Sequence, residues 1–229
     1  MRTLNTVLQH DNVAVRLLRG IFGLTSLVTV AVNVYLQVDR YGSTDLGNYF
    51  SYFTIQSNII IAVILIVGAT RPRSSLPDWW DDLRGAAALY IGVTGIVFAL
   101  FLSNLSAEVG TSDQWVNWVL HDLTPVVGVL DWLLIRSQGR ARRLRFVWWL
   151  VYPVVYLVFT LARGRLVGWY PYPFIDPTLP GGYSRLIGST GLVVIVIVLV
   201  ALIIDILGRL RDRLGPRDRA GSEPLRIGS

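Results

Sequence analysis

The sequence predicts an all-α integral membrane protein, built as a bundle of six transmembrane helices. The 229 residues have a mean hydropathy of +0.52, and only 16% are charged, which is unusual for a soluble domain of this size. The apolar residues form six runs, each close to the ~20 residues that cross a ~30 Å hydrocarbon core. Tryptophan and tyrosine cluster near the ends of these runs, as they do at membrane interfaces.

Each run is expected to be helical, because a single segment in lipid must satisfy its own backbone hydrogen bonds. An outer-membrane barrel would instead show alternating segments of ~10 residues, which the sequence lacks. One transmembrane domain is predicted over residues 1–208, followed by a disordered, arginine-rich tail at 209–229. The predicted helices are residues 15–36, 47–69, 83–105, 115–135, 146–163 and 185–208.

The distribution of arginine predicts the orientation. All 21 basic residues are arginine, and with the amino terminus inside, seventeen fall in cytoplasmic segments. Both termini are therefore predicted to be cytoplasmic, in a multi-pass protein of the cytoplasmic (inner) membrane. Asp131 and Asp205 are expected to be interfacial charges, with Asp205 paired to Arg209 one turn along the same helix.

Composition excludes several classes of function. The net charge of +6 comes from arginines in short segments between apolar runs, so no nucleic-acid partner is expected. The chain has no cysteine and two histidines, which excludes thiol chemistry and a zinc site with several histidine ligands. We expect no metal and no cofactor. The expected partners are membrane lipids and a lipid-like substrate or ligand, and the oligomeric state stays open.

One polar helical face stands out within the second run. Thr54, Ser57 and Asn58 follow the i, i+3, i+4 spacing of a helix, and hydroxyl and amide groups avoid hydrocarbon, so this face should look inward. His121, in the fourth run, lies at a similar depth. Counted from the outer ends of their runs, Thr54 and His121 both sit on the order of 10 Å inside the membrane.

These residue types suit nucleophilic catalysis. A threonine hydroxyl becomes a nucleophile when a neighbouring base such as His121 takes its proton, and Asn58 or Ser57 would then donate to the oxyanion. Asp122 follows His121 directly and is a weaker candidate for orienting the imidazole. The alternative is a purely structural role for Thr54, since hydroxyl groups in membrane helices usually hydrogen-bond to main chain or to a neighbouring helix.

The outer ends of the fifth and sixth runs supply candidates for binding a headgroup. Arg163 and Arg165 lie on the outer side, where a guanidinium suits a carboxylate or phosphate. Tyr172 belongs to the segment Tyr170–Phe174, in which alternating prolines predict a rigid interfacial loop that covers the opening.

The six-run plan, the segment Tyr52–Thr54 and His121 followed by Pro125 resemble the androgen-induced/androgen-dependent transmembrane protein family. Animal members of that family are threonine hydrolases that cleave fatty acid esters of hydroxy fatty acids. The resemblance implies that Thr54 is the nucleophile and His121 the catalytic histidine.

The chain looks still more similar to a bacterial branch of integral membrane proteins related to that family, over about residues 15–208. The residues around His121 depart from the animal pattern, and Gln56, Ser57 and Asn58 belong to the bacterial pattern, which suits a different substrate. The shared motifs are Thr54–Asn58, the segment His121–Trp132, Tyr152-Pro153 and Tyr170–Phe174.

The sequence thus leaves three hypotheses. The leading one is a membrane hydrolase of a lipid or fatty acyl ester, with Thr54 and His121 in a pocket that faces the outer leaflet. The second is a non-enzymatic protein that binds a lipid or another hydrophobic ligand in the same cavity. The third is a scaffold subunit of a membrane complex, whose arginine-rich tail contacts partners or anionic headgroups.

Overall fold

The computed structural model describes residues 12–42, 45–103, 113–137 and 144–214. Within these ranges all regular structure is helical, which confirms the all-α prediction. The short elements are α3 (Leu46–Tyr49) and the 3₁₀ turns η1 (Arg73–Ser75) and η5 (Pro173–Ile175). The longer segments are α2 (Val13–Tyr41), α4 (Phe53–Thr70), α5 (Trp79–Val97) with the π turn η2 (Phe98–Leu102), α6 (Gln114–Trp118) with the π turn η4 (Val119–Leu123) and α7 (Thr124–Leu134), α8 (Arg145–Trp149) with α9 (Val151–Val167), and α10 (Gly182–Leu214).

Five helices of the described chain are long and apolar enough to cross a membrane, which indicates a multi-pass membrane protein. These five are Val13–Arg40, Phe53–Thr70, Trp79–Leu102, Arg145–Val167 and Gly182–Arg213. The continuous helical segment from α6 to α7 falls outside this set. It carries His121, Asp122 and Asp131, which lower its hydropathy.

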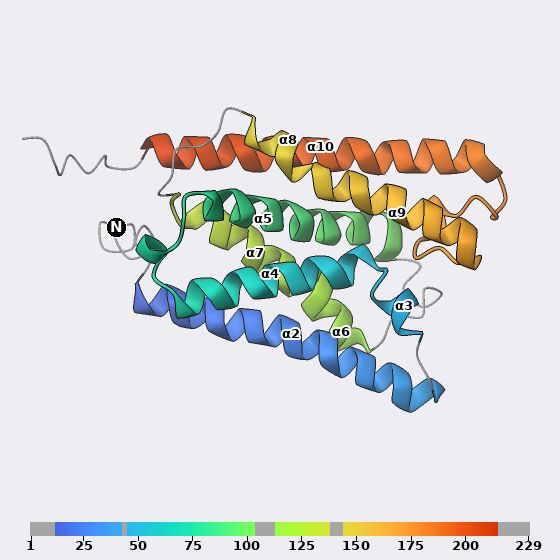
Figure 1. The fold of residues 1–229 in the computed structure, drawn as a ribbon, viewed down its shortest axis with the longest axis horizontal. Coiled ribbons are helices and arrows are strands. Elements are labelled where there is room, and N and C mark those ends of the chain that lie inside the picture. The colour runs from blue at the N-terminus through green and yellow to red at the C-terminus, as the bar shows by residue number, and fades with distance from the viewer. Residues whose placement is uncertain (1–11, 43–44, 104–112, 138–143, 215–229) are drawn as a thin grey trace, which may run out of the picture.

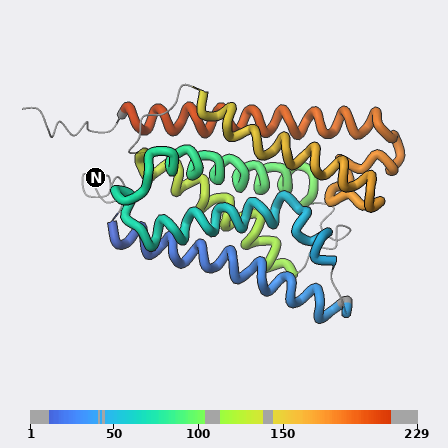
Figure 2. Tube along the Cα trace, in the orientation of Figure 1, coloured from blue at the N-terminus to red at the C-terminus, as the bar shows by residue number. Residues whose placement is uncertain are grey.

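The helices run roughly along one long axis (Figure 1). Helix α2 lies along one side and α10 along the opposite side, with α4, α5 and α7 between them. The same path is visible in the trace of Figure 2, where the start of α2 and the end of α10 lie at the same end of the bundle. We call this the arginine end, because the ion pairs described below gather there. The turn between α9 and α10 and the short helix α3 lie at the other end (Figure 1).

The predicted helix 47–69 is broken in the structure. Helix α3 ends at Tyr49, Tyr52 is extended (φ −70°, ψ 129°), and α4 begins at Phe53. The first main-chain N–H groups of a helix lack acceptors within the helix, and at the start of α4 two tyrosine phenol oxygens accept their hydrogen bonds. Phe53 N donates to Tyr156 Oη (3.1 Å) and Thr54 N donates to Tyr172 Oη (3.2 Å).

Two prolines account for other irregular turns. Pro153 has no N–H and its ring crowds the carbonyl four residues earlier, so the predicted helix 146–163 divides at Leu150 into α8 and α9. The ring of Pro125 likewise crowds the carbonyl of His121, four residues earlier. The wide π turn η4, which contains His121, directly precedes α7, the helix that carries Pro125. His121 therefore sits in a π turn rather than in a regular helix.

The last helix is longer than predicted. Helix α10 continues to Leu214, so residues 209–214 of the predicted disordered tail are helical. The rest of that tail, 215–229, lies outside the described residues. The extension is held in part by Arg211, whose guanidinium donates to the carbonyls of Trp132 and Ile135 at the end of α7. These carbonyls lack partners inside α7, so Arg211 satisfies them from a neighbouring helix.

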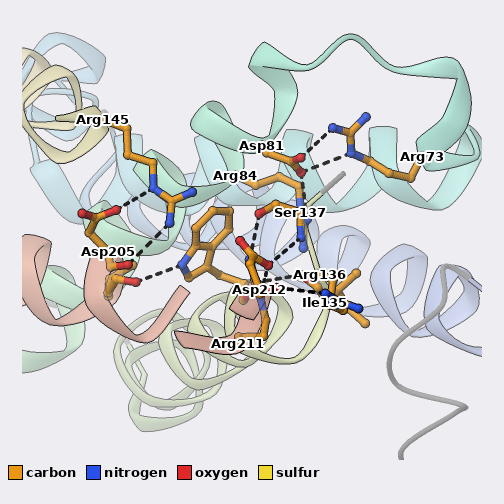
Figure 3. A network of polar contacts seen from close by, with 12 residues as sticks. Arg73, Asp81, Arg84, Ile135, Arg136, Ser137, Arg145, Asp205, Arg211 and Asp212 are labelled. Carbon is orange, nitrogen blue, oxygen red and sulfur yellow. Dashed lines mark hydrogen bonds and ion pairs between the residues drawn. The ribbon is translucent and has the colours of Figure 1, made fainter. Parts of the chain in front are cut away.

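Asp131 forms a buried charge network, which corrects its predicted interfacial position. Its carboxylate pairs with Arg19 of α2 (2.6 Å) and Arg84 of α5 (2.9 Å). Arg84 also pairs with Asp81 (3.3 Å), and Asp81 with Arg73 (2.6 Å), as Figure 3 shows. Charges that leave water need such partners, so the network fixes the register of α2, α5 and α7.

Asp205 is likewise buried, at 5% exposure, rather than interfacial. It accepts from Arg145 of α8 at 2.6 Å (Figure 3). It also accepts from Arg209 at 2.8 Å, which is the pair predicted from the sequence. The guanidinium groups of Arg145 and Arg211 also lie 5.0 and 4.8 Å from the centre of the Trp132 ring. These contacts join α7, α8 and α10 at the arginine end.

Candidate functional site

A largely apolar cavity of about 140 Å³ lies between α5, α9, α10 and the segment around η5, with the first turn of α4 at its edge. Valine, leucine, isoleucine and aromatic side chains form most of its wall. An apolar cavity of this size stays dry and can hold a hydrocarbon guest. We call it the acyl cavity.

The acyl cavity opens sideways. Val154 of α9 and Val194 of α10 both line it, yet they are 59% and 42% exposed on the outer surface of the helices. On membrane-spanning helices such a surface faces lipid, so the cavity communicates with the hydrocarbon layer between α9 and α10. A guest would therefore enter from the bilayer.

Hydroxyl groups are confined to a few positions on the wall. They belong to Thr54, Thr94, Tyr156, Tyr172 and Thr190. Tyr172 is buried, stacks on Phe174 with ring centres 5.0 Å apart, and accepts the hydrogen bond from Thr54 N. Burial raises the pKa of the Tyr172 phenol, against a smaller opposite effect of hydrogen bonding to Thr54. The phenol therefore stays protonated at neutral pH and keeps a proton to donate.

The structure places the predicted nucleophile Thr54 in the second position of α4, where it lines the acyl cavity. It is 8% exposed. Tyr172, predicted as a headgroup residue, lines the same cavity, and these two residues are the only members of the predicted set that do.

His121 is buried but does not line the cavity. Its ring stacks on Phe98, with centres 3.9 Å apart and planes inclined by 19°. Its Nδ1 lies 3.2 Å from the carbonyl oxygen of Asn117, and because a carbonyl can only accept, this contact is a hydrogen bond in the tautomer that carries the proton on Nδ1. In that neutral tautomer the lone pair lies on Nε2, which is the form a general base needs.

Asn58 joins the turns that carry Thr54 and His121. Its amide nitrogen donates to the carbonyls of Thr54 (2.9 Å) and Leu120 (3.1 Å), and its oxygen accepts from Ser26 (3.1 Å). Both amide hydrogens are therefore committed to main chain, which leaves none for an oxyanion in this arrangement. In the described structure no hydrogen bond links the Thr54 hydroxyl to the His121 ring, although Asn58 ties their turns together.

The remaining predicted residues lie outside the cavity wall. Ser57 is buried, and its hydroxyl has no hydrogen-bond partner among the described residues. Asp122 is exposed, as is Arg165. Arg163 donates to Asn48 Oδ1 (2.8 Å) and lies 5.6 Å from the Trp169 ring, near the break between α3 and α4.

Sequence reasoning missed three of the site's hydroxyls, those of Thr94, Tyr156 and Thr190. Tyr156 follows Tyr152 by one helical turn, and that i, i+4 pair could have marked the face of α9 that meets α4. Tyr152 donates to Gln56, and Tyr156 donates to the carbonyl of Ser51 (2.8 Å). Thr190 had no comparable signal, because a single threonine in an apolar run is ordinary.

Comparisons of the chain with protein-family models, curated proteins and solved structures found no match.

Proposed function

We propose that the protein binds the hydrocarbon chain of a lipid-like molecule in the acyl cavity, with the polar end of that molecule held near Thr54 and Tyr172. One observation carries the proposal: an apolar cavity is open to the surface between α9 and α10 and has hydroxyl groups at few positions. Such a site, with apolar walls and a small number of oriented polar groups, matches the chemistry of a molecule with one polar head and one chain.

The proposal includes the orientation of the protein in the membrane. The chain would cross six times, with the α6–α7 segment as the additional span and both termini in the cytoplasm. The excess of arginine in the segments at the arginine end supports this, because short cytoplasmic segments are enriched in basic residues. Thr54 and Tyr172 would then lie nearer the outer leaflet of the cytoplasmic membrane.

Photocrosslinking tests the binding site. The full chain is reconstituted in lipid nanodiscs with palmitic acid that carries a diazirine near its methyl end, irradiated, and digested for mass spectrometry. Labelling is expected on peptides of α5, α9 and α10 that line the cavity. Val193→Phe narrows the cavity and should reduce this labelling several-fold.

Ile195→Phe makes a comparable change on the outward face of the same helix, where Ile195 is 56% exposed and outside the cavity wall. It should leave cavity labelling unchanged. Equal labelling in the wild type, Val193→Phe and Ile195→Phe would overturn the binding proposal.

A second candidate function is hydrolysis of an acyl ester. It is favoured by Thr54 at the cavity wall and by the contact of His121 Nδ1 with the Asn117 carbonyl, which fits the tautomer whose lone pair is on Nε2. The resemblance to the androgen-induced family supports the same pair of residues. Thr54 Oγ1 would attack the acyl carbonyl as His121 takes its proton, and the alcohol would leave with that proton. Water would then release the acid from the acyl-threonine.

This reaction requires His121 to approach Thr54, and Tyr172 is the phenol placed to donate to the oxyanion. A fluorophosphonate probe tests it on the wild type, Thr54→Val and His121→Gln. Covalent labelling should disappear in Thr54→Val and fall strongly in His121→Gln. Labelling that persists in both variants would eliminate the hydrolase and leave the binding function.

A further inference from the structure

Thr190 of α10 is a polar residue of the acyl cavity whose hydroxyl takes part in no hydrogen bond within the described structure. It lines the cavity, and its hydroxyl oxygen is buried without a hydrogen-bond partner among the described residues. A buried hydroxyl without a partner is costly, so its persistence in an apolar wall needs a reason.

Thr94 shows what a cavity threonine does when it serves only the helix. Its hydroxyl donates to the carbonyl of Tyr90, one turn earlier, at 3.0 Å. This is the usual solution for threonine in a helix. Thr190 lines the same cavity from another helix but makes no such bond. The two threonines therefore differ in whether the side-chain hydroxyl has a hydrogen-bond partner.

A series of contacts also links Thr190 to two other hydroxyl-bearing residues of the cavity wall. Its neighbour Ser189 donates to the carbonyl of Phe174 (2.6 Å), and Phe174 stacks on Tyr172. Tyr172 in turn accepts from Thr54 N. This chain of contacts connects Thr190 on α10 with Thr54 on α4 through the loop that covers the cavity.

We propose that Thr190 hydrogen-bonds to the oxygen-bearing head of the cavity's ligand and so selects chains that end in an ester or a carboxyl group. This inference rests on the proposed binding function. Rotation about the Cα–Cβ bond carries the hydroxyl between the helix and the cavity, so Thr190 is able to engage a ligand oxygen when the cavity is filled. A purely hydrocarbon guest would leave the hydroxyl without a partner, as it is in the structure.

Competition for the crosslinking site distinguishes recognition of the ligand's polar head by Thr190 from a general affinity of the cavity for hydrocarbon chains. Nanodiscs that contain the full chain and the diazirine-bearing palmitic acid are titrated with methyl palmitate or with hexadecane. Thr190→Val removes the hydroxyl and keeps the shape of the side chain. It should raise the methyl palmitate concentration for half-maximal competition about tenfold, the equivalent of one hydrogen bond. Competition by hexadecane should not change.

Two further variants control the experiment. Thr94→Val makes the same isosteric change in the same cavity at a hydroxyl that already has a partner, and it should stay within about twofold of the wild type. Thr190→Ser keeps a hydroxyl and should retain most of the discrimination. Equal competition curves for Thr190→Val and Thr94→Val with methyl palmitate would overturn the role of Thr190, while cavity labelling of the wild type persists. Absence of cavity labelling in the wild type would instead overturn the binding function itself, and this inference with it.

Discussion

The phenol oxygen of Tyr156, on α9, accepts a hydrogen bond from the main-chain nitrogen of Phe53, the first residue of α4, at 3.1 Å. The same oxygen donates to the carbonyl of Ser51 at 2.8 Å, within the break between α3 and α4. One side chain therefore satisfies two of the main-chain groups that the break exposes. The position of Thr54 depends on this contact, because Thr54 is the next residue of α4.

Tyr156→Phe tests the importance of that contact. The change leaves the ring in place but removes both hydrogen bonds, so the free energy of unfolding should fall by about 1–3 kcal/mol. Unfolding in mixed micelles with increasing sodium dodecyl sulfate measures it. Tyr183→Phe is the control, since Tyr183 is 68% exposed and should tolerate the loss of its hydroxyl. Equal stability of the two variants would show that the break is held by other contacts.

Asp131→Asn should be among the most destabilising single changes in the bundle. It leaves Arg19 and Arg84 buried without the carboxylate between them, and loss of one partner from a buried pair costs about 3–5 kcal/mol. Asp122→Asn is the matched change on the same helical segment, and because Asp122 is exposed, its effect should stay within about 0.5 kcal/mol. The same unfolding assay applies. A loss below about 1 kcal/mol for Asp131→Asn would contradict the burial of this network.

Gly164 and Gly188 should respond oppositely to alanine. A Cβ on Gly164 would lie 2.1 Å from the ring of Tyr170, so Gly164→Ala must displace the loop that leads to the acyl cavity and should cost about 1–3 kcal/mol. At Gly188, within α10, nothing lies within 4 Å of the added carbon. Gly188→Ala should stabilise the protein by about 0.5–1 kcal/mol through lower backbone entropy in the unfolded state. A neutral result at Gly164 would mean that Tyr170 does not pack on α9.

The proposed orientation is testable because the chain has no cysteine. Ser74→Cys and Thr178→Cys place single thiols on exposed residues at opposite ends of the bundle. In intact cells a membrane-impermeant maleimide should label Thr178→Cys, and Ser74→Cys only after the membrane is permeabilised. The reverse pattern would invert the proposed topology, and labelling of both thiols in intact cells would rule out a span between them.

Hydropathy was sufficient to predict the helices but not their interruptions. The apolar run from residue 47 to 69 gave no sign of the break at residues 50–52, since the phenols that satisfy it come from Tyr156 and Tyr172, more than a hundred residues away. Pro153 and Pro125 were visible in the sequence. The backbone distortion that each proline causes depends on the neighbouring helices, because a membrane helix can accommodate a proline by a kink, a break or a π turn.

The ion pair of Asp131 with Arg19 could not be predicted for a similar reason. These residues are 112 positions apart, so no local pattern pairs them, whereas Asp205 and Arg209 are one turn apart and the sequence predicts their pair. The polar face of Thr54, Ser57 and Asn58 was expected to serve one site. In the structure Thr54 lines the acyl cavity while Asn58 bonds to main chain, a division that depends on how α2 and η4 pack against α4.

The two ends of the bundle differ in whether their ion pairs are buried. Buried ion pairs tie α2, α5, α7, α8 and α10 at the arginine end, while phenols, stacked rings and a short loop hold the end near Thr54, where the ion pair between Arg40 and Asp113 is exposed. Charged contacts out of water resist separation more strongly than neutral hydrogen bonds. If α9 and α10 move apart to admit a guest, the spreading is therefore expected to begin at the Thr54 end and to pivot about the charged one.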